Sequence, residues 1–186
     1  MIQSSSDVAP LAVTMGDPAG IGPDILLSAW ARRGALGLPP FCAFADPELL
    51  TARAHALGLA LRPHEIGSPG LTVATFSSSL PVIPVRCAVP VSAGVPDTRN
   101  AAATIASIEA AVAAVEAGAA SAVVTNPIAK SVLYSAGFSH PGHTEFLAAL
   151  AERRRPGQHY SPVMMLACAD LKVVPLTIHI PLSEVP

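Results

Sequence analysis

The amino-acid sequence predicts an α/β fold, because short apolar segments alternate along it with segments of helical character. Residues 122–124 form an apolar run with two valines, and the Asn-Pro pair shortly after it is typical of the start of a helix. Residues 11–15 and 41–45 are also apolar, and each run is followed by turn residues that lead into a helix. These three strand–turn–helix units indicate a sheet with helices packed on it.

The composition is that of a chain with a large apolar core and little net charge. Of the 186 residues, 51% are hydrophobic and 13% are charged, and the formal net charge is −2. These values exclude a disordered chain and provide no basic surface for nucleic acid. The first residues lack the pattern of a signal peptide, and the apolar stretch 101–124 contains two glutamates, which argues against a membrane span. We expect a cytoplasmic protein that binds neither nucleic acid nor membranes.

The three cysteines, Cys42, Cys87 and Cys168, are far apart, odd in number and show no C-x-x-C spacing. This pattern indicates neither a disulfide framework nor a zinc knuckle. We expect all three to be reduced thiols in the core.

Residues 16–23, Gly-Asp-Pro-Ala-Gly-Ile-Gly-Pro, turn the first strand into a helix that is expected to end near residue 32. Glycines in such a turn let the backbone come close to a ligand, and the N-terminus of a helix favours anions. The spacing differs from the dinucleotide-binding G-x-G-x-x-G, so an ordinary tight turn is an equally good interpretation. Asp17 accordingly either lines a site or caps the helix.

The middle of the chain is predicted to contain a helix, several short strands and a longer helix. The first helix covers 46–58, since Asp46 is a good N-cap and a proline follows it. Residues 59–90 alternate β-like runs with Pro, Gly and Ser, which favours antiparallel or edge strands. An alanine-rich helix over 99–117 is expected to pack closely on the sheet or on a second subunit. Its predicted core stripe is Ile105, Ile108, Val112 and Val115, at spacings of three and four.

The segment 121–146 carries the densest group of polar and titratable residues in the chain. After its strand, which we expect to be buried, Asn126 is predicted to cap a helix that stops at Gly137. Polar residues at the carboxyl end of a strand indicate a site, because open α/β sheets bind their ligands there. Lys130 either holds a phosphate or carboxylate as a point charge or is a solvated lysine of the first helical turn.

The loop 139–145 offers two interpretations of its histidine and threonine. His143 and Glu145 form an oriented acid–base pair, or Thr144 caps a helix that begins at Glu145. The same helix is expected to continue to residue 153.

Two apolar strands over 163–168 and 173–178 are separated by a short turn and are predicted to form a hairpin. The second strand leads to His179. Taken alone, such a residue is more often a hydrogen-bonded structural histidine, because one ligand does not make a metal site. Ser183 has the character of a helix cap with no helix after it, so we expect the chain to be a fragment.

Four segments together are more specific than any one of them: TMGDPAGIGP over 14–23, TNPIAK over 125–130, PGHTEF over 141–146 and TIHIPL over 177–182. In this order they resemble the 4-hydroxythreonine-4-phosphate dehydrogenase family of pyridoxal phosphate biosynthesis. The resemblance implies a three-layer α/β sandwich similar to isocitrate and isopropylmalate dehydrogenases. Residues 1–186 are then the N-terminal portion of a two-lobed enzyme, which forms a homodimer with shared active sites.

The resemblance also implies an activity: NAD-dependent oxidation and decarboxylation of 4-phosphohydroxy-L-threonine, assisted by a divalent metal (zinc, magnesium or cobalt). Carried over by position, His143 and Thr144 match the substrate-binding pair, and His179 matches the first of three histidine ligands of the metal. The other two histidines and the residues that grip the phosphate are expected beyond Pro186. The resemblance supports a role in the site less strongly for Lys130 and Asp17, and it leaves the catalytic residues unassigned.

Two alternatives keep the same motifs. A related dehydrogenase would act on another phosphorylated hydroxy acid, such as a threonate or erythronate phosphate. A non-catalytic, truncated module would bind a small anion and keep a dimer surface. Acyl or phosphoryl transfer lacks support, because the sequence has neither G-x-S-x-G nor a P-loop spacing.

Overall fold

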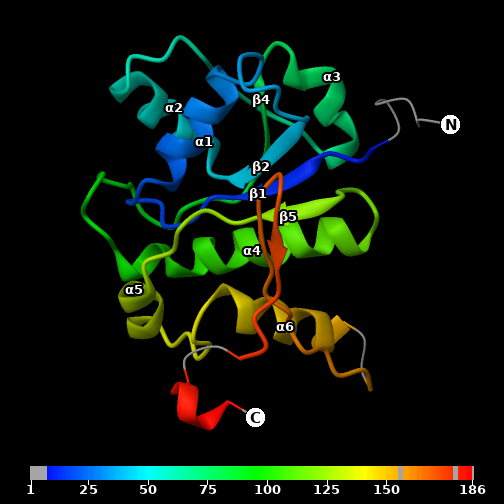
Figure 1. The fold of residues 1–186 in the computed structure, drawn as a ribbon. Coiled ribbons are helices and arrows are strands. Elements are labelled where there is room, and N and C mark those ends of the chain that lie inside the picture. Colours follow the sequence, from blue (N-terminus) through cyan, green and yellow to red (C-terminus); the bar gives the residue numbers. More distant parts are fainter. Residues whose placement is uncertain (1–7, 155–156, 178–179, 186) are drawn as a thin grey trace, which may run out of the picture. The chain divides into compact units, whose positions relative to one another are not determined.

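The computed structural model of the protein describes residues 8–154, 157–177 and 180–185. The chain divides into two compact units, Met1–Ser139 and His140–Pro186. The first unit contains a five-stranded sheet with helices, and the second contains a helix and a small hairpin (Figure 1). Among the described residues, no helix combines the length and the apolar character needed to cross a membrane.

The sheet of the first unit is entirely parallel. Its strands are β1 (Leu11–Thr14), β2 (Phe41–Ala45), β3 (Pro63–Glu65), β4 (Leu80–Pro84) and β5 (Ala122–Val124), in the order β3-β4-β2-β1-β5. The predicted α/β class is confirmed. The expectation of antiparallel strands within 59–90 is wrong, although β3 is an edge strand as predicted. A short helix, α3 (Thr72–Phe76), returns the chain between β3 and β4 and makes their pairing parallel.

The helices of this unit begin and end largely where the sequence predicts. They are α1 (Gly22–Ala31), α2 (Pro47–Ala56), α4 (Ala101–Glu116) and α5 (Lys130–Ser135), with 3₁₀ turns η1 (Pro69–Leu71) and η2 (Thr98–Asn100). The Asp46 carboxylate caps α2 by accepting the amides of Glu48 at 2.9 Å and Leu49 at 3.4 Å. Gly137 follows α5 in the left-handed conformation, with φ +89°.

Alternation along the strands divides the core into two layers. On β2, Phe41, Ala43 and Ala45 join the layer that contains Leu27 and Trp30 of α1. Its other residues, Cys42 and Phe44, join the layer that contains Ala111 and Ala114 of α4. Helices α1 and α2 therefore cover one face of the sheet and α4 covers the other, which gives three layers (Figure 1).

The face of α4 that packs on the sheet differs from the predicted stripe. Ile108 is fully buried, whereas Ile105, Val112 and Val115 are only half-buried. The buried face consists mainly of small residues: Ala101, Ala103, Thr104, Ser107, Ile108, Ala111 and Ala114. Small side chains let the helix lie close to the sheet, as the alanine content predicts. The Ser107 hydroxyl uses this closeness to accept the Met15 amide at 2.9 Å and to donate to the Phe44 carbonyl at 2.6 Å.

The second unit contains α6 (His143–Arg154), a two-stranded antiparallel sheet of β6 (Leu166–Ala167) and β7 (Lys172–Val173), and the 3₁₀ turn η3 (Leu182–Glu184). The predicted hairpin is confirmed, but its strands are only two residues long. The Cys168 amide donates to the Leu171 carbonyl at 2.8 Å and closes the turn.

The cysteines differ in exposure, and all three are free thiols. Cys42 is buried on β2, which agrees with the prediction. The prediction is wrong for Cys168, which is exposed in the hairpin, and Cys87 is half-buried. Local apolar character therefore locates a strand without ensuring that its side chains are covered.

Candidate functional site

The turn after β1 and the segment after β5 meet at the carboxyl edge of the sheet, where parallel α/β folds bind ligands. Gly16 has φ +73°, and a Cβ there would lie 2.6 Å from the Pro127 carbonyl oxygen and 2.8 Å from the Asn126 Cβ. A Cβ on Gly22 would lie 2.5 Å from the Met15 carbonyl oxygen and 3.1 Å from the Asn126 Cβ. The glycines thus leave room for the chain itself, which corrects the expectation that they let a ligand approach the backbone.

Asp17 is a buried residue of this turn, with 9% of its surface exposed. Its amide donates to the Pro127 carbonyl at 2.9 Å, and its Oδ1 accepts the Ala19 amide at 2.8 Å. The interpretation of Asp17 as a helix cap is wrong, because α1 begins five residues later and Ile21 occupies its N-cap without a side-chain bond. Asp17 also lines a pocket of about 10 Å³, which has room for no more than a water molecule.

Asn126 does not cap α5, contrary to the prediction. The N-cap of that helix is Ala129, and Asn126 is bound instead to the end of β1. Its side-chain amide Nδ2 donates to the Thr14 carbonyl at 2.8 Å, and its backbone amide donates to the Thr14 hydroxyl at 3.1 Å. Asn126 is therefore a buried connection between the ends of β1 and β5.

Lys130 is the first residue of α5, and its side chain is exposed. The helix is held to the unit by Leu133, which is 2% exposed. The structure thus brings together the segments that carry Asp17 and Lys130, through the bond from the Asp17 amide to Pro127. The exposed ammonium is free of the desolvation cost that a buried lysine bears, so it can receive an anion.

Arg53 supports the turn after β1 from the side opposite to Asn126. This residue was not identified from the sequence. It lies on α2, is 8% exposed, and its Nη1 is 2.5 Å from Asp24 Oδ2. The guanidinium also donates to the carbonyls of Pro18 at 3.2 Å and Gly20 at 3.3 Å. An arginine within a helix resembles an ordinary surface residue in the sequence, so no local signal could have found this role.

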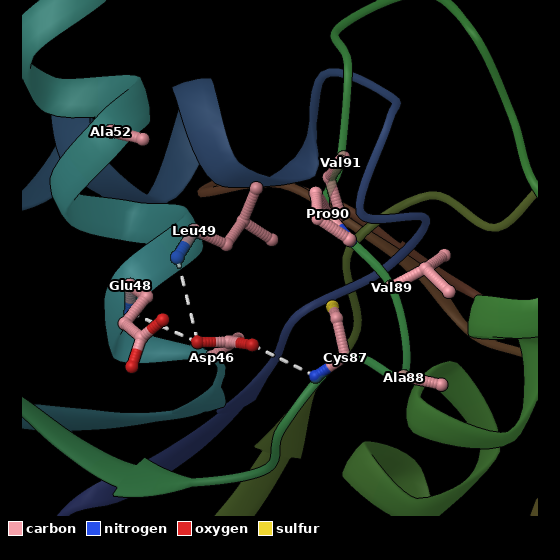
Figure 2. Close-up of a pocket in the computed structure, with 9 residues that line it drawn as sticks. All are labelled: Asp46, Glu48, Leu49, Ala52, Cys87, Ala88, Val89, Pro90 and Val91. Carbon is pink, nitrogen blue, oxygen red and sulfur yellow. Dashed lines mark hydrogen bonds between the residues drawn. The ribbon is translucent and has the colours of Figure 1, made fainter.

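A second feature of the carboxyl edge is a cavity of about 350 Å³ between the start of α2 and the segment 87–91 (Figure 2). Its lining residues are Asp46, Glu48, Leu49, Ala52, Cys87, Ala88, Val89, Pro90 and Val91. The cap at the start of α2 could be predicted from the sequence. The approach of segment 87–91 to it could not, because that contact depends on the tertiary structure.

The polar groups at this cavity already have structural partners. Beyond capping α2, Asp46 accepts the Cys87 amide on Oδ2 at 2.8 Å (Figure 2). Arg86 lies 3.5 Å from Asp46 and 2.7 Å from Glu65, and its bond to Glu65 raises the pKa of the guanidinium. Burial, reinforced by the Asp46 charge, raises the pKa of the Cys87 thiol to about 12. A neutral thiol of this kind is a poor nucleophile, and we assign the cavity no ligand.

His143 and Thr144 belong to the second unit, where they are the first two residues of α6. Because α6 begins at His143, the prediction that Thr144 caps a helix starting at Glu145 is wrong. His143 and Glu145 lie two positions apart on a helix and therefore do not face each other, which argues against an oriented acid–base pair. Thr144 is exposed, whereas His143 is half-buried with its Nε2 atom covered.

The predicted metal ligand His179 lies outside the described residues. Within the described part of the chain, no group of three or more His, Cys, Asp or Glu residues is placed to hold a metal ion. The described residues therefore do not form the metal site that the family resemblance implies.

A parallel sheet with helices on both faces defines the chain as an α/β protein, and comparison with known proteins specifies its family. The family model described as "Pyridoxal phosphate biosynthetic protein PdxA" matches residues 38–186. The chain belongs to this family.

Three similar proteins that match nearly the whole chain share one name. A 4-hydroxythreonine-4-phosphate dehydrogenase of Methylorubrum populi is 55% identical over 98% of this chain and 52% of its own length. One from Xanthobacter autotrophicus is 52% identical over 96% of this chain and 50% of its own length. The crystal structure of the Klebsiella pneumoniae protein of that name superposes with a TM-score of 0.80 at 30% identity, over 95% of this chain and 53% of that one. The chain thus spans about half the length of these relatives.

Proposed function

We propose that this chain is the N-terminal part of a cytoplasmic, NAD-dependent and metal-assisted dehydrogenase that oxidises and decarboxylates 4-hydroxythreonine 4-phosphate in pyridoxal 5′-phosphate biosynthesis. The observation that carries the proposal is membership of a family in which a relative 55% identical to this chain is named 4-hydroxythreonine-4-phosphate dehydrogenase. The four motifs that led to the same expectation lie within the matched span of these relatives.

In this proposal each candidate residue has a binding role that suits its chemistry. His143 and Thr144 hydrogen-bond the polar groups of the substrate from the first turn of α6. Lys130 attracts the phosphate or carboxylate as an exposed point charge. Asp17 shapes the wall of the site, because its side chain is committed to its own turn. None of these residues is assigned a proton transfer.

NAD would accept the hydride from the secondary alcohol, and a divalent metal would polarise the oxygen of the alcohol and of the ketone. For the metal, His179 is the ligand that this chain is proposed to supply. For NAD, the turn 16–22 is a poor candidate, since Asn126 and Pro127 fill the space that its glycines leave.

A coupled assay with matched histidine variants tests the proposal. NADH formation is followed with 4-hydroxythreonine 4-phosphate, NAD and added zinc or magnesium, and binding of the same compound is measured by calorimetry. Because the other two metal-binding histidines and the phosphate-binding residues are expected beyond Pro186, turnover is measured on the full-length enzyme that contains this chain. There we expect metal-dependent turnover that is lost in His179→Ala and kept in His64→Ala, which changes an exposed histidine. Absence of both binding and turnover would contradict the proposal.

The assay also separates the alternatives when threonate and erythronate 4-phosphates are included. A preference for one of these acids would assign the chain to a related dehydrogenase. If the protein bound 4-hydroxythreonine 4-phosphate and both of these acids without metal-dependent turnover, the result would favour the anion-binding module. The proposed enzyme is a homodimer with shared sites. Size-exclusion chromatography with light scattering measures its oligomeric state directly.

A further inference from the structure

We propose that Asn126 is a positioning residue, which holds the Lys130 segment and the Asp17 turn in one arrangement at the carboxyl edge of the sheet. This inference rests on the proposed function, in which Lys130 receives an anionic group of the substrate. Asn126 itself is 6% exposed and has no access to a ligand.

The first observation is the way Asn126 continues the pairing of β1 with β5. Register pairs join the two strands up to Val13 and Val124. Beyond Val124 the segment after β5 leaves the sheet, and two hydrogen bonds from Asn126 to Thr14 take the place of the backbone pairing between the strands. Its Nδ2 donates to the carbonyl at 2.8 Å and its backbone amide donates to the hydroxyl at 3.1 Å. Two bonds to one residue fix both the position and the direction of the departing segment.

The second observation is steric. Gly16 and Gly22 are the residues against which the Asn126 side chain packs, and a Cβ on either would lie within 3.1 Å of the Asn126 Cβ. The neighbouring Pro127 carbonyl accepts the Asp17 amide at 2.9 Å. The turn and the segment therefore fit each other through Asn126, and neither can shift without the other.

The consequence concerns Lys130, which follows Asn126 by four residues at the start of α5. One end of this short segment is held by Asn126, and the other by the buried Leu133. The attraction between a point charge and an anion depends on the distance between them, and in active sites a misplacement of about 1 Å can lower the reaction rate about a hundredfold. Asn126→Ala would remove the side-chain bond and leave the backbone bond, which would loosen the segment without removing any group that touches the substrate.

A double-mutant cycle on the 186-residue chain tests this role. Affinity for 4-hydroxythreonine 4-phosphate is measured by calorimetry for Asn126→Ala, Lys130→Ala and the double variant. We expect Asn126→Ala to weaken binding about tenfold in the parent chain and less than about twofold in the Lys130→Ala background, since it acts through Lys130. Equal weakening in both backgrounds would overturn the proposal, because Asn126 would then act on the fold alone.

Two further variants make the cycle decisive. Thr14→Val removes only the hydroxyl that accepts the Asn126 amide, so it should fold normally and reproduce a smaller, Lys130-dependent loss. Trp30→Phe removes the indole bond to the Phe76 carbonyl near the opposite end of α1, and it should leave affinity unchanged. If the parent chain binds but Lys130→Ala binds equally well, the role of Lys130 fails and this inference fails with it. If the parent chain does not bind at all, the failure belongs to the proposed function.

Discussion

The two units of the chain use similar apolar segments with opposite results. In Met1–Ser139, the strands β1, β2 and β4 lie between helices, and residues such as Leu27 and Leu80 are fully covered. Among the described residues of His140–Pro186, the buried hydrophobic ones are Phe146 and Leu150, both on α6. The large apolar residues of the hairpin region are exposed: Val163, Met164, Met165, Leu166, Leu171, Val173, Val174 and Leu176.

The difference shows what an apolar run does and does not determine. Such a run favours an extended strand in both units, because branched and apolar side chains suit a pleated backbone. Its burial depends on a second layer, which α1, α2 and α4 provide in the first unit. A two-stranded hairpin has too little surface to bury its own side chains. The contrast can be tested with matched changes in the two units.

The largest expected effect is the difference between the thiols of Cys42 and Cys168. Cys42 is buried on β2, so a reagent reaches it only when the first unit opens, whereas Cys168 is exposed. We expect iodoacetamide to alkylate Cys168 at least about a thousandfold faster than Cys42. Mass spectrometry of timed, quenched samples measures both rates in one experiment.

Cys87 provides an internal check on that experiment. Because burial and Asp46 raise its pKa to about 12, its thiolate fraction should increase about tenfold for each unit of pH until pH 12. Its alkylation should therefore remain slow at pH 7 and accelerate steeply in alkali. Comparable alkylation rates for Cys42 and Cys168 at neutral pH would contradict the proposed difference in burial between the two units.

Truncation of one leucine in each unit should give the next largest difference. Leu27 is 0% exposed and Leu176 is 85% exposed. Leu27→Ala removes packed atoms and leaves a cavity, which costs about 2–5 kcal/mol of unfolding free energy. Leu176→Ala should change it by less than about 0.5 kcal/mol. Urea unfolding followed by circular dichroism measures both, and a large loss in Leu176→Ala would mean that the hairpin is covered in solution.

Two glycines with positive φ extend the comparison to the backbone. Gly16 has φ +73° and no room for a Cβ, whereas Gly157 in the second unit has φ +87° and nothing within 4 Å of the added atom. Gly16→Ala should cost about 2–3 kcal/mol, since backbone strain and overlap with Pro127 add. Gly157→Ala should cost about 1 kcal/mol, from the conformation alone. Equal thermal unfolding of the two variants would indicate that the turn 16–22 relaxes easily.

The same contrast explains how much of the molecule could be predicted from its sequence. The strands β1, β2 and β5, each followed by a helix, the cap of α2 and the hairpin all depend on local patterns, and these predictions are confirmed. The burial of β5 was predicted wrongly, because Val124 lies on an edge strand and is 44% exposed. The stripe on α4 was predicted correctly only at Ile108, since hydrophobicity ranks isoleucine and valine above the small residues that mainly face the sheet.

The candidate site was predictable only in part. Sequence motifs indicated the segments of Asp17 and Lys130, and the structure brings those segments together. The roles of Asn126 and Arg53 depend on contacts between residues 29 or more positions apart, which no local pattern encodes. His143 and Thr144 were found from their motif, and their binding role stays a prediction, as does that of His179.

The smallest expected effect concerns an exposed ion pair of the first unit. It tests whether the contribution of a residue to stability depends on its exposure or on the unit to which it belongs. Asp97 precedes η2 and accepts hydrogen bonds from the Arg99 guanidinium and the Arg99 amide, which lower the pKa of its carboxyl to about 2 from the ordinary 3.8. The folded state thus binds fewer protons than the unfolded state between pH 2 and 4. The stability that Asp97 contributes is complete above about pH 4 and is lost as the pH falls towards 2.

This contribution should be small, because the Arg99 side chain is 69% exposed and water screens the pair. Asp97→Asn should therefore lower stability slightly at pH 7 and flatten the decline between pH 4 and 2, whereas Asp170→Asn removes an equal charge from the exposed turn of the second unit. Thermal unfolding at half-unit steps of pH measures both profiles. A large change in the Asp97→Asn profile alone would show that even exposed groups of the first unit are coupled to its core. The two units would then differ in the cooperativity of their unfolding rather than in the burial of their side chains.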